Sequence, residues 1–180
     1  MAALMATAQA QCTGQVGLCF ATSGPGAIHL LNGLYDAKLD HVGVVAIMGQ
    51  QARTAIGSNY QQEVDLQSLC KDVASEYIVT VTEPPQMRHA IDRAVRIARH
   101  KRSPTVIIVP NALQDLSYSE PPMAHGSTNT GIRTTIGRTA PEEAALRAAT
   151  DILTSGHHVP TPAGAGPLSA TAEPLKHAER

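Results

Sequence analysis

The sequence predicts an α/β protein whose open parallel sheet is covered by helices on both faces. Short apolar segments alternate with helical segments through residues 1–118, joined by short connections. Two of the apolar segments, "VGVVAIMG" and "TVIIVP", are apolar at almost every position, as in strands buried on both faces. A glycine turn, "TSGPGA", follows an earlier strand at the position where open α/β sheets bind ligands.

The first part of this region is expected to contain two helices and two strands. Residues 1–13 form a helix that ends at Gly14, because glycine adopts the left-handed conformation of a helix C-cap. Residues 16–22 are a strand, residues 26–39 a helix, and residues 42–49 a second strand. No Ser, Thr, Asp or Asn precedes the first helix, so we expect the chain to start inside a domain.

The second part continues the alternation. A short helix is expected over residues 65–71, a strand over 76–81 and a buried strand over 104–110. Glu63 and Asp65 are expected to cap the short helix, where negative charge meets the positive end of the helix dipole.

A long amphipathic helix is expected over residues 85–101. Its apolar face has the spacing i, i+3, i+4, i+7 and consists of Ile91, Ala94, Val95 and Ala98. Its solvated face carries Arg93, Arg96 and Arg99.

The composition changes after Tyr118, since seven of the twelve prolines lie beyond it. Residues 119–140 are predicted to be an extended linker. Residues 141–180 are predicted to begin a second, central domain that is incomplete in this sequence. It opens with a helix over residues 141–156, with Pro141 in the first turn and Gly156 at the C-cap.

Composition argues against several classes of function. A net charge of −1 and an aromatic content of 3% indicate no nucleic acid partner. The longest apolar runs are too short to span a membrane. The three cysteines, Cys12, Cys19 and Cys70, have no metal-ligand spacing and are expected to be buried hydrophobes in a reducing compartment. Without a signal peptide pattern, a cytoplasmic location is predicted.

The turn "TSGPGA" has two interpretations. Gly24 and Gly26 remove side chains from a sharp bend that Pro25 stiffens, so the backbone could approach a ring or a phosphate closely. Alternatively, the turn is only a tight connection between a strand and a helix. It matches neither GxGxxG nor a Walker A loop, so its spacing does not specify a dinucleotide or a nucleoside triphosphate.

Three segments together resemble a known family. They are "ATSGPGAIHLLNGLYDAKLDHVGVVAIMGQ", "IGSNYQQEVD" and "RSPTVIIVP". They resemble the N-terminal pyrimidine-binding (Pyr) domain of thiamine-diphosphate-dependent enzymes of the pyruvate oxidase and acetolactate synthase type. The resemblance covers residues 1–118, without the domain's first strand. Residues 119–158 resemble the family's linker and the first helix of its central domain.

The resemblance implies a set of cofactor-binding residues. The pocket for the aminopyrimidine ring would be lined by Thr22, Ser23, Gly24, Pro25 and Gly26. His29 stands where many relatives carry Asn. Gln62 matches a Gln that reaches the thiazolium and substrate region, and Arg102 matches an Arg that touches FAD in flavin-containing members.

The resemblance also implies an activity and what would be missing for it. Relatives decarboxylate 2-oxo acids such as pyruvate, and their active sites form between the subunits of an oligomer. Their catalytic Glu precedes the segment that matches "MAALMATAQA", and a GDG…N motif in a third domain holds Mg²⁺. Neither occurs here, so no catalytic or metal-binding residue is assigned and the Mg²⁺ site would lie outside this sequence. The chain is expected to be inactive alone.

Two alternatives remain open at this stage. The chain would be a non-catalytic or split Pyr subunit if it pairs with a separate diphosphate-binding chain. It would be an unrelated nucleotide-binding α/β domain if its ligand contains no thiamine.

Overall fold

A computed structural model describes residues 1–120, 140–156, 164, 172, 175 and 176. The chain falls into two units, Met1–Thr134 and Thr135–Arg180. The predicted linker over 119–140 lies almost entirely outside the described residues, and so does half of the predicted central-domain segment over 141–180. Those two domain assignments therefore stay predictions.

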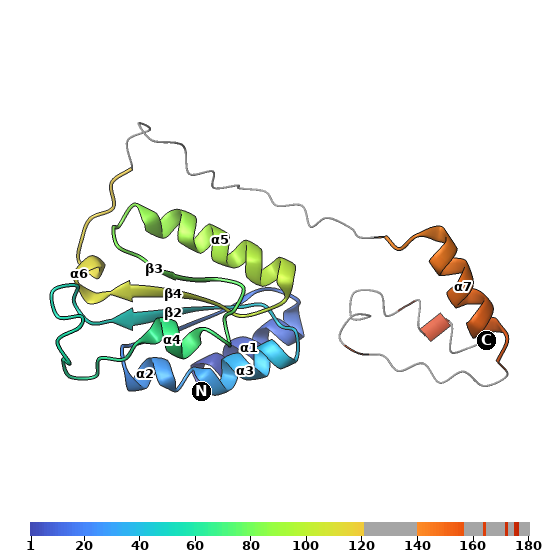
Figure 1. The fold of residues 1–180 in the computed structure, drawn as a ribbon, viewed down its shortest axis with the longest axis horizontal. Helices are drawn as coiled ribbons and strands as arrows, with labels where there is room; N and C mark the ends of the chain where they lie inside the picture. The colour runs from blue at the N-terminus through green and yellow to red at the C-terminus, as the bar shows by residue number, and fades with distance from the viewer. Residues whose placement is uncertain (121–139, 157–163, 165–171, 173–174, 177–180) are drawn as a thin grey trace. The chain divides into compact units, whose positions relative to one another are not determined.

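The first unit is built on a sheet of four parallel strands in the order β1-β2-β4-β3 (Figure 1). The strands are β1 (Gly17–Ala21), β2 (Val44–Gln50), β3 (Ile78–Thr80) and β4 (Thr105–Pro110). The two central strands, β2 and β4, are almost wholly buried. Their continuous apolar character therefore has the predicted cause, and the predicted parallel sheet is confirmed.

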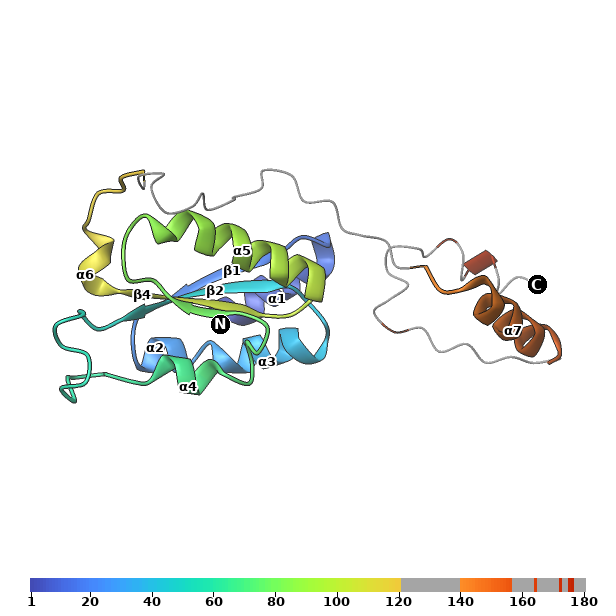
Figure 2. The ribbon, with the colours of Figure 1, turned by 45° about the horizontal axis from the view of Figure 1, so that its top comes forward.

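Helices cover both faces of this sheet (Figure 2). One face is covered by α1 (Ala2–Thr13), α2 (Pro25–Ile28), α3 (Leu31–Leu39) and α4 (Leu66–Cys70). The other face is covered by α5 (Gln86–Lys101), with Leu113 of α6 (Asn111–Gln114) in the same core cluster. Each face thus has its own apolar core, as the α/β prediction requires.

The helix that was predicted over residues 26–39 is two helices in the structure. After α2, the amide of Leu30 bonds to the carbonyl of Ala27 at 3.1 Å, three residues back, where an α-helix would use residue 26. The chain turns there, and Leu30 is buried under the sheet. The short helix α6 was not predicted. Its four residues carry too little periodicity for a helix to be recognised.

The buried face of α5 differs from the predicted one. Ala90, Ala94 and Ala98 are fully buried, whereas Ile91 and Val95 are each 37% exposed at the edge of the contact. A stripe of alanines lets the helix lie close to the sheet, so the larger residues are displaced to the flank. The prediction was therefore right for Ala94 and Ala98, but it placed Ile91 and Val95 in the buried face in place of Ala90.

In the second unit, α7 (Glu143–Thr154) is the predicted helix with shorter bounds. Glu142 is the N-cap and Ser155 the C-cap, so the predictions for Pro141 and Gly156 were wrong. Both residues lie just outside the helix, because its intrahelical bonds begin and end one or two residues further in.

Two of the three cysteines follow the prediction. Cys19 and Cys70 are buried, and burial raises the pKa of each thiol to about 11. Cys12 is exposed on α1, so the prediction that it is buried was wrong. The helix turns Cys12 away from the alanine face that contacts α3. None of the helices in the described part of the chain has the length and apolarity that crossing a membrane requires.

Candidate functional site

The glycine turn follows β1, on the side of the sheet where the carboxyl ends of all four parallel strands lie. Gly24 has φ 59° and ψ −121°, the mirror image of extended backbone, which only glycine adopts readily. A Cβ at this residue would lie 2.5 Å from the carbonyl oxygen of Gln62. Pro25 follows at the first position of α2, where its missing N–H costs no hydrogen bond. The turn therefore needs glycine for two independent reasons.

The loop after β2 returns to this turn. The side-chain amide of Gln51 donates to Ser23 Oγ at 3.2 Å and to the carbonyl oxygen of Gln61 at 2.8 Å. The neighbouring Gln50 is buried and donates to the carbonyl oxygen of Val64 at 2.9 Å. Gln51 thus joins the turn after β1 to the loop that carries Gln62, and Gln50 holds the later part of the same loop at Val64.

A cavity of about 880 Å³ opens at the carboxyl ends of the strands. This volume lies in the range of cofactor pockets. Its apolar wall comes from the strands, from α5 and from the segment after α6, and includes Phe20, Ile47, Met87, Val109 and Leu116. Its polar groups sit on the strand ends and on α6, and are Thr22, Ser23, Gln50, Gln51, Asn111 and Gln114. The cavity can thus accept a flat ring with hydrogen-bonding edges.

The predicted site residues are only partly brought together. Thr22 and Ser23 line the cavity, and Gly24 contacts Gln62 beside it. Pro25 continues the same turn. A Cβ on Gly26 would lie 2.6 Å from the methyl group of Thr22, so Gly26 allows Thr22 its place at the cavity.

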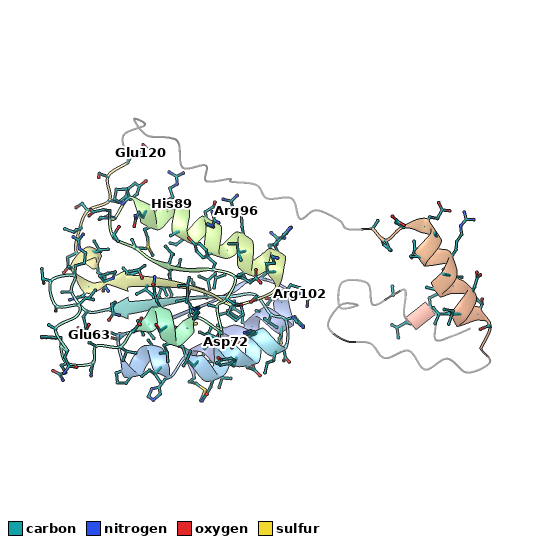
Figure 3. All side chains as sticks on the ribbon, viewed as in Figure 1. Glu63, Asp72, His89, Arg96, Arg102 and Glu120 are labelled. Atoms are coloured by element: carbon teal, nitrogen blue, oxygen red, sulfur yellow. The ribbon has the colours of Figure 1, made fainter. Side chains whose placement is uncertain are left out.

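Two predicted residues lie apart from the cavity. His29 is exposed at the end of α2 and is not among the cavity-lining residues. Arg102 lies at the other end of the sheet, before β4, where its Nε donates to the carbonyl oxygen of His41 at 3.0 Å. Figure 3 shows Arg102 at one end of the sheet and Glu63 at the other. The roles of His29 toward thiamine and of Arg102 toward FAD stay predictions.

Two carboxylates near the loop have different partners, although the same role was predicted for both. Asp65 is the N-cap of α4 and accepts hydrogen bonds from the hydroxyl and the amide of Ser68, which lower its pKa. Glu63 does not cap α4. Its carboxylate accepts hydrogen bonds from the amides of Gly57 and Tyr60, and these bonds lower its pKa. The prediction was right for Asp65 and wrong for Glu63, because Glu63 lies inside the loop and faces its backbone.

The predicted site did not include Gln50, Gln51 or the cavity residues contributed by α5, α6 and the segment after α6. A signal for Gln50 and Gln51 is present: two amide side chains directly follow a buried strand, one strand away from the glycine turn. Asn111 has a comparable signal, because it directly follows the buried strand β4, whereas Gln114 has none, because the four-residue helix that carries it was not recognised.

Replacing Gln51 with Ala should loosen the link between the turn and the loop. Two hydrogen bonds are lost and the carbonyl of Gln61 loses its donor, so we expect the free energy of unfolding to fall by about 1–2 kcal/mol. Urea denaturation measures this, with Gln67→Ala as the matched control, since Gln67 is exposed and bonds only to Thr80 Oγ. Equal stability of the two variants would show that the Gln51 bonds contribute nothing.

These features define a class of protein. The first unit is a parallel α/β domain whose candidate ligand site lies at the carboxyl ends of its strands, beside a turn in which Gly24 has a positive φ. Residues 1–69, which include that turn, match the family described as "Thiamine pyrophosphate enzyme, N-terminal TPP binding domain".

Three relatives illustrate the similarity. Pyruvate oxidase of Lactiplantibacillus plantarum is 41% identical over 108 residues, 60% of this chain and 18% of the relative. The acetolactate synthase large subunit of Parasynechococcus marenigrum is 34% identical over 171 residues, 93% of this chain and 27% of the relative. That of Porphyra purpurea is 40% identical over 116 residues, 63% of this chain and 20% of the relative. The chain thus spans about a fifth to a quarter of the length of these relatives.

The first unit is an N-terminal domain of the thiamine pyrophosphate (thiamine diphosphate) enzyme family, of the pyruvate oxidase and acetolactate synthase type.

Proposed function

We propose that the cavity beside the glycine turn holds the aminopyrimidine ring of thiamine pyrophosphate. We also propose that the chain serves as part of an enzyme that decarboxylates a 2-oxo acid such as pyruvate. The observation that carries the first proposal is the hydrogen bond between Ser23 and Gln51, which both line the cavity, beside the close approach of Gly24 to Gln62. The second rests on similarity to enzymes that are several times longer than this chain.

The chemistry of the cavity suits an aminopyrimidine. Such a ring has two apolar faces, which Phe20, Ile47 and Met87 can cover, and its nitrogen edge needs donors and acceptors. Side-chain amides supply both kinds of group, and Gln50, Asn111 and Gln114 place three of them in the lining. Neutral amides and hydroxyls bind and orient a neutral heterocycle without the desolvation cost of a buried charge.

The described residues that line the cavity include no Asp, Glu, His, Lys or Arg. They can orient a ring and exclude water, but they offer no carboxylate or imidazole to move a proton at neutral pH. When bound, thiamine pyrophosphate supplies the electron sink for decarboxylation of a 2-oxo acid. We therefore propose that the chain binds the ring and that acid–base catalysis needs further polypeptide, whether in the same protein or on a partner chain as in a split enzyme.

The described residues do not fit a magnesium site, since they contain no group of three His, Cys, Asp or Glu side chains placed to hold a metal ion. No step is therefore derived through Mg²⁺. The flavin contact predicted for Arg102 would lie at the opposite end of the sheet from the cavity, so no flavin chemistry is derived either. Oligomerisation and a cytoplasmic location stay predictions.

A binding experiment tests the proposal. Because the cavity lining is neutral, the diphosphate should add little to binding by this chain alone. We expect thiamine and thiamine pyrophosphate to bind with dissociation constants within a few-fold of each other, on the order of 1 mM. Changes in the NMR spectrum of the labelled chain would measure both, with shifts concentrated at Ser23 and Gln51. Pyruvate added to the saturated chain should not be consumed.

Three outcomes would contradict the proposal. Binding of ADP or NAD at the same residues, in place of thiamine, would favour an unrelated nucleotide-binding domain. Shifts that avoid Ser23 and Gln51 would place the ligand elsewhere. Turnover of pyruvate by the chain alone would show that it carries its own acid–base group.

A further inference from the structure

The loop between β2 and α4 has an unusual backbone for its composition. Asn59 and Gln62 have φ values of 58° and 62°, and Gly57 has a φ of 88°. The left-handed region is unfavourable for residues with a Cβ, so Asn59 and Gln62 need outside support to stay there. Few apolar contacts provide it, since Gly57 and the residues up to Gln62 are exposed.

One side chain supplies that support. The two carboxylate oxygens of Glu63 accept separate hydrogen bonds, from the amide of Gly57 at 2.5 Å and from the amide of Tyr60 at 3.0 Å. The amide of Glu63 donates to the carbonyl of Tyr60 at 2.9 Å, which closes the turn from the other side. Bonds to a charged acceptor are stronger than those between neutral groups. The carboxylate thus ties the backbone at Gly57 and at Tyr60 to Glu63.

This conformation determines what the turn at β1 meets. Gln62 directly precedes Glu63, and a Cβ on Gly24 would lie 2.5 Å from the Gln62 carbonyl oxygen and 2.8 Å from its Cβ. The carbonyl of Gln61 accepts the hydrogen bond from Gln51 at 2.8 Å. Both contacts are made with Gln62 in its left-handed conformation. Ser23 and Gln51, which are hydrogen-bonded to each other, also line the cavity.

We propose that Glu63 is a positioning residue: by binding the amides of Gly57 and Tyr60, it folds the loop so that Gln61 and Gln62 close against the glycine turn. The relevance of this role to thiamine pyrophosphate rests on the proposed function, whereas the role itself is a property of the loop. The neighbouring Asp65 does not share it, because its carboxylate is engaged by Ser68 at the start of α4.

Two variants of the full chain test the role. Glu63→Ala removes both acceptors, and Glu63→Gln keeps one neutral acceptor and removes the charge. We expect exchange of the Gly57 and Tyr60 amide protons to accelerate about ten- to hundredfold in Glu63→Ala, with an intermediate value in Glu63→Gln. The nuclear Overhauser contact between Gly24 and Gln62 should disappear in Glu63→Ala and weaken in Glu63→Gln. Exchange in β2 and β4 should be unchanged.

The matched control is Glu76→Gln, which removes an exposed carboxylate paired with Lys101 at 3.7 Å, away from the loop. It should leave both loop measurements unchanged. An unchanged Gly24–Gln62 contact in Glu63→Ala would overturn the proposal. Faster exchange throughout the sheet in both Glu63 variants would also overturn it, since the carboxylate would then serve general stability.

A titration with thiamine pyrophosphate tests the proposed function independently of the proposed role of Glu63. If the loop responds as expected but the unmodified chain binds no thiamine pyrophosphate, Glu63 keeps its role and the proposed function fails. If the chain binds thiamine pyrophosphate and the loop does not respond, the proposed function survives and the role of Glu63 is refuted. If the chain binds thiamine pyrophosphate and the loop responds as expected, Glu63→Ala should raise the dissociation constant of thiamine pyrophosphate about tenfold, and Glu63→Gln should raise it less.

Discussion

Replacing Gly24 with Ala should destabilise the first unit by about 3 kcal/mol or more, because strained backbone costs about 1–3 kcal/mol and overpacking costs a similar amount. The new Cβ would sit 2.5 Å from the Gln62 carbonyl and 2.8 Å from its Cβ, on backbone with φ 59°. Thermal unfolding monitored by circular dichroism should show a fall of roughly 10 °C in the midpoint for a domain of this size.

Gly14→Ala is the matched control for that measurement. Gly14 also has a positive φ, 67°, but a Cβ there would meet nothing within 4 Å. It should therefore cost only the conformational penalty, about 1 kcal/mol. If the two variants were equally stable, the close approach of Gln62 to the glycine turn would be wrong, and with it the contact on which the candidate site depends.

Replacing Ile107 with Ala should cost about 3–4 kcal/mol, within the range for large-to-small changes in a core. Ile107 is fully buried in β4, between β2 and β3 and under α5. The cavity left behind cannot be filled easily, because the residues of α5 that are fully buried in this core, Ala90, Ala94 and Ala98, have short side chains. Urea denaturation would measure the loss as a lower midpoint with an unchanged m-value, which is the slope of the unfolding free energy against urea concentration.

Ile91→Ala tests the packing of α5 at the flank of the helix, outside its buried face. Ile91 is 37% exposed, so its removal should cost less than about 1 kcal/mol. The sequence pattern placed Ile91 in the buried stripe, and that placement would predict a much larger cost. A large effect of Ile91→Ala together with a small effect of Ile107→Ala would contradict the structure of this layer.

The order of the elements was predictable because each has a strong local signal. The apolar strands β2 and β4, the C-cap at Gly14 and the cap of α4 at Asp65 all appear where residue type and spacing placed them. These features depend on neighbours within about one helical turn or one strand length. The errors arose where packing between elements decides, as in the break between α2 and α3 and in the buried face of α5.

The candidate site shows the same division. Residue types alone predicted a sharp glycine turn at the end of a parallel strand and left open whether it holds a ligand, and the family resemblance favoured a thiamine site there. Only the tertiary structure brought Gln51 and Gln62 against that turn and placed the Glu63 carboxylate on the amides of Gly57 and Tyr60.

The sequence by itself determined the fold class and the glycine turn after the first strand, because hydrophobic periodicity and glycine conformations act locally. The tertiary structure decided which side chains line the cavity and which hold the loop. The contacts of the glycine turn with Gln51 and Gln62 join residues about 30 to 40 positions apart, whose approach depends on how the sheet and its helices pack.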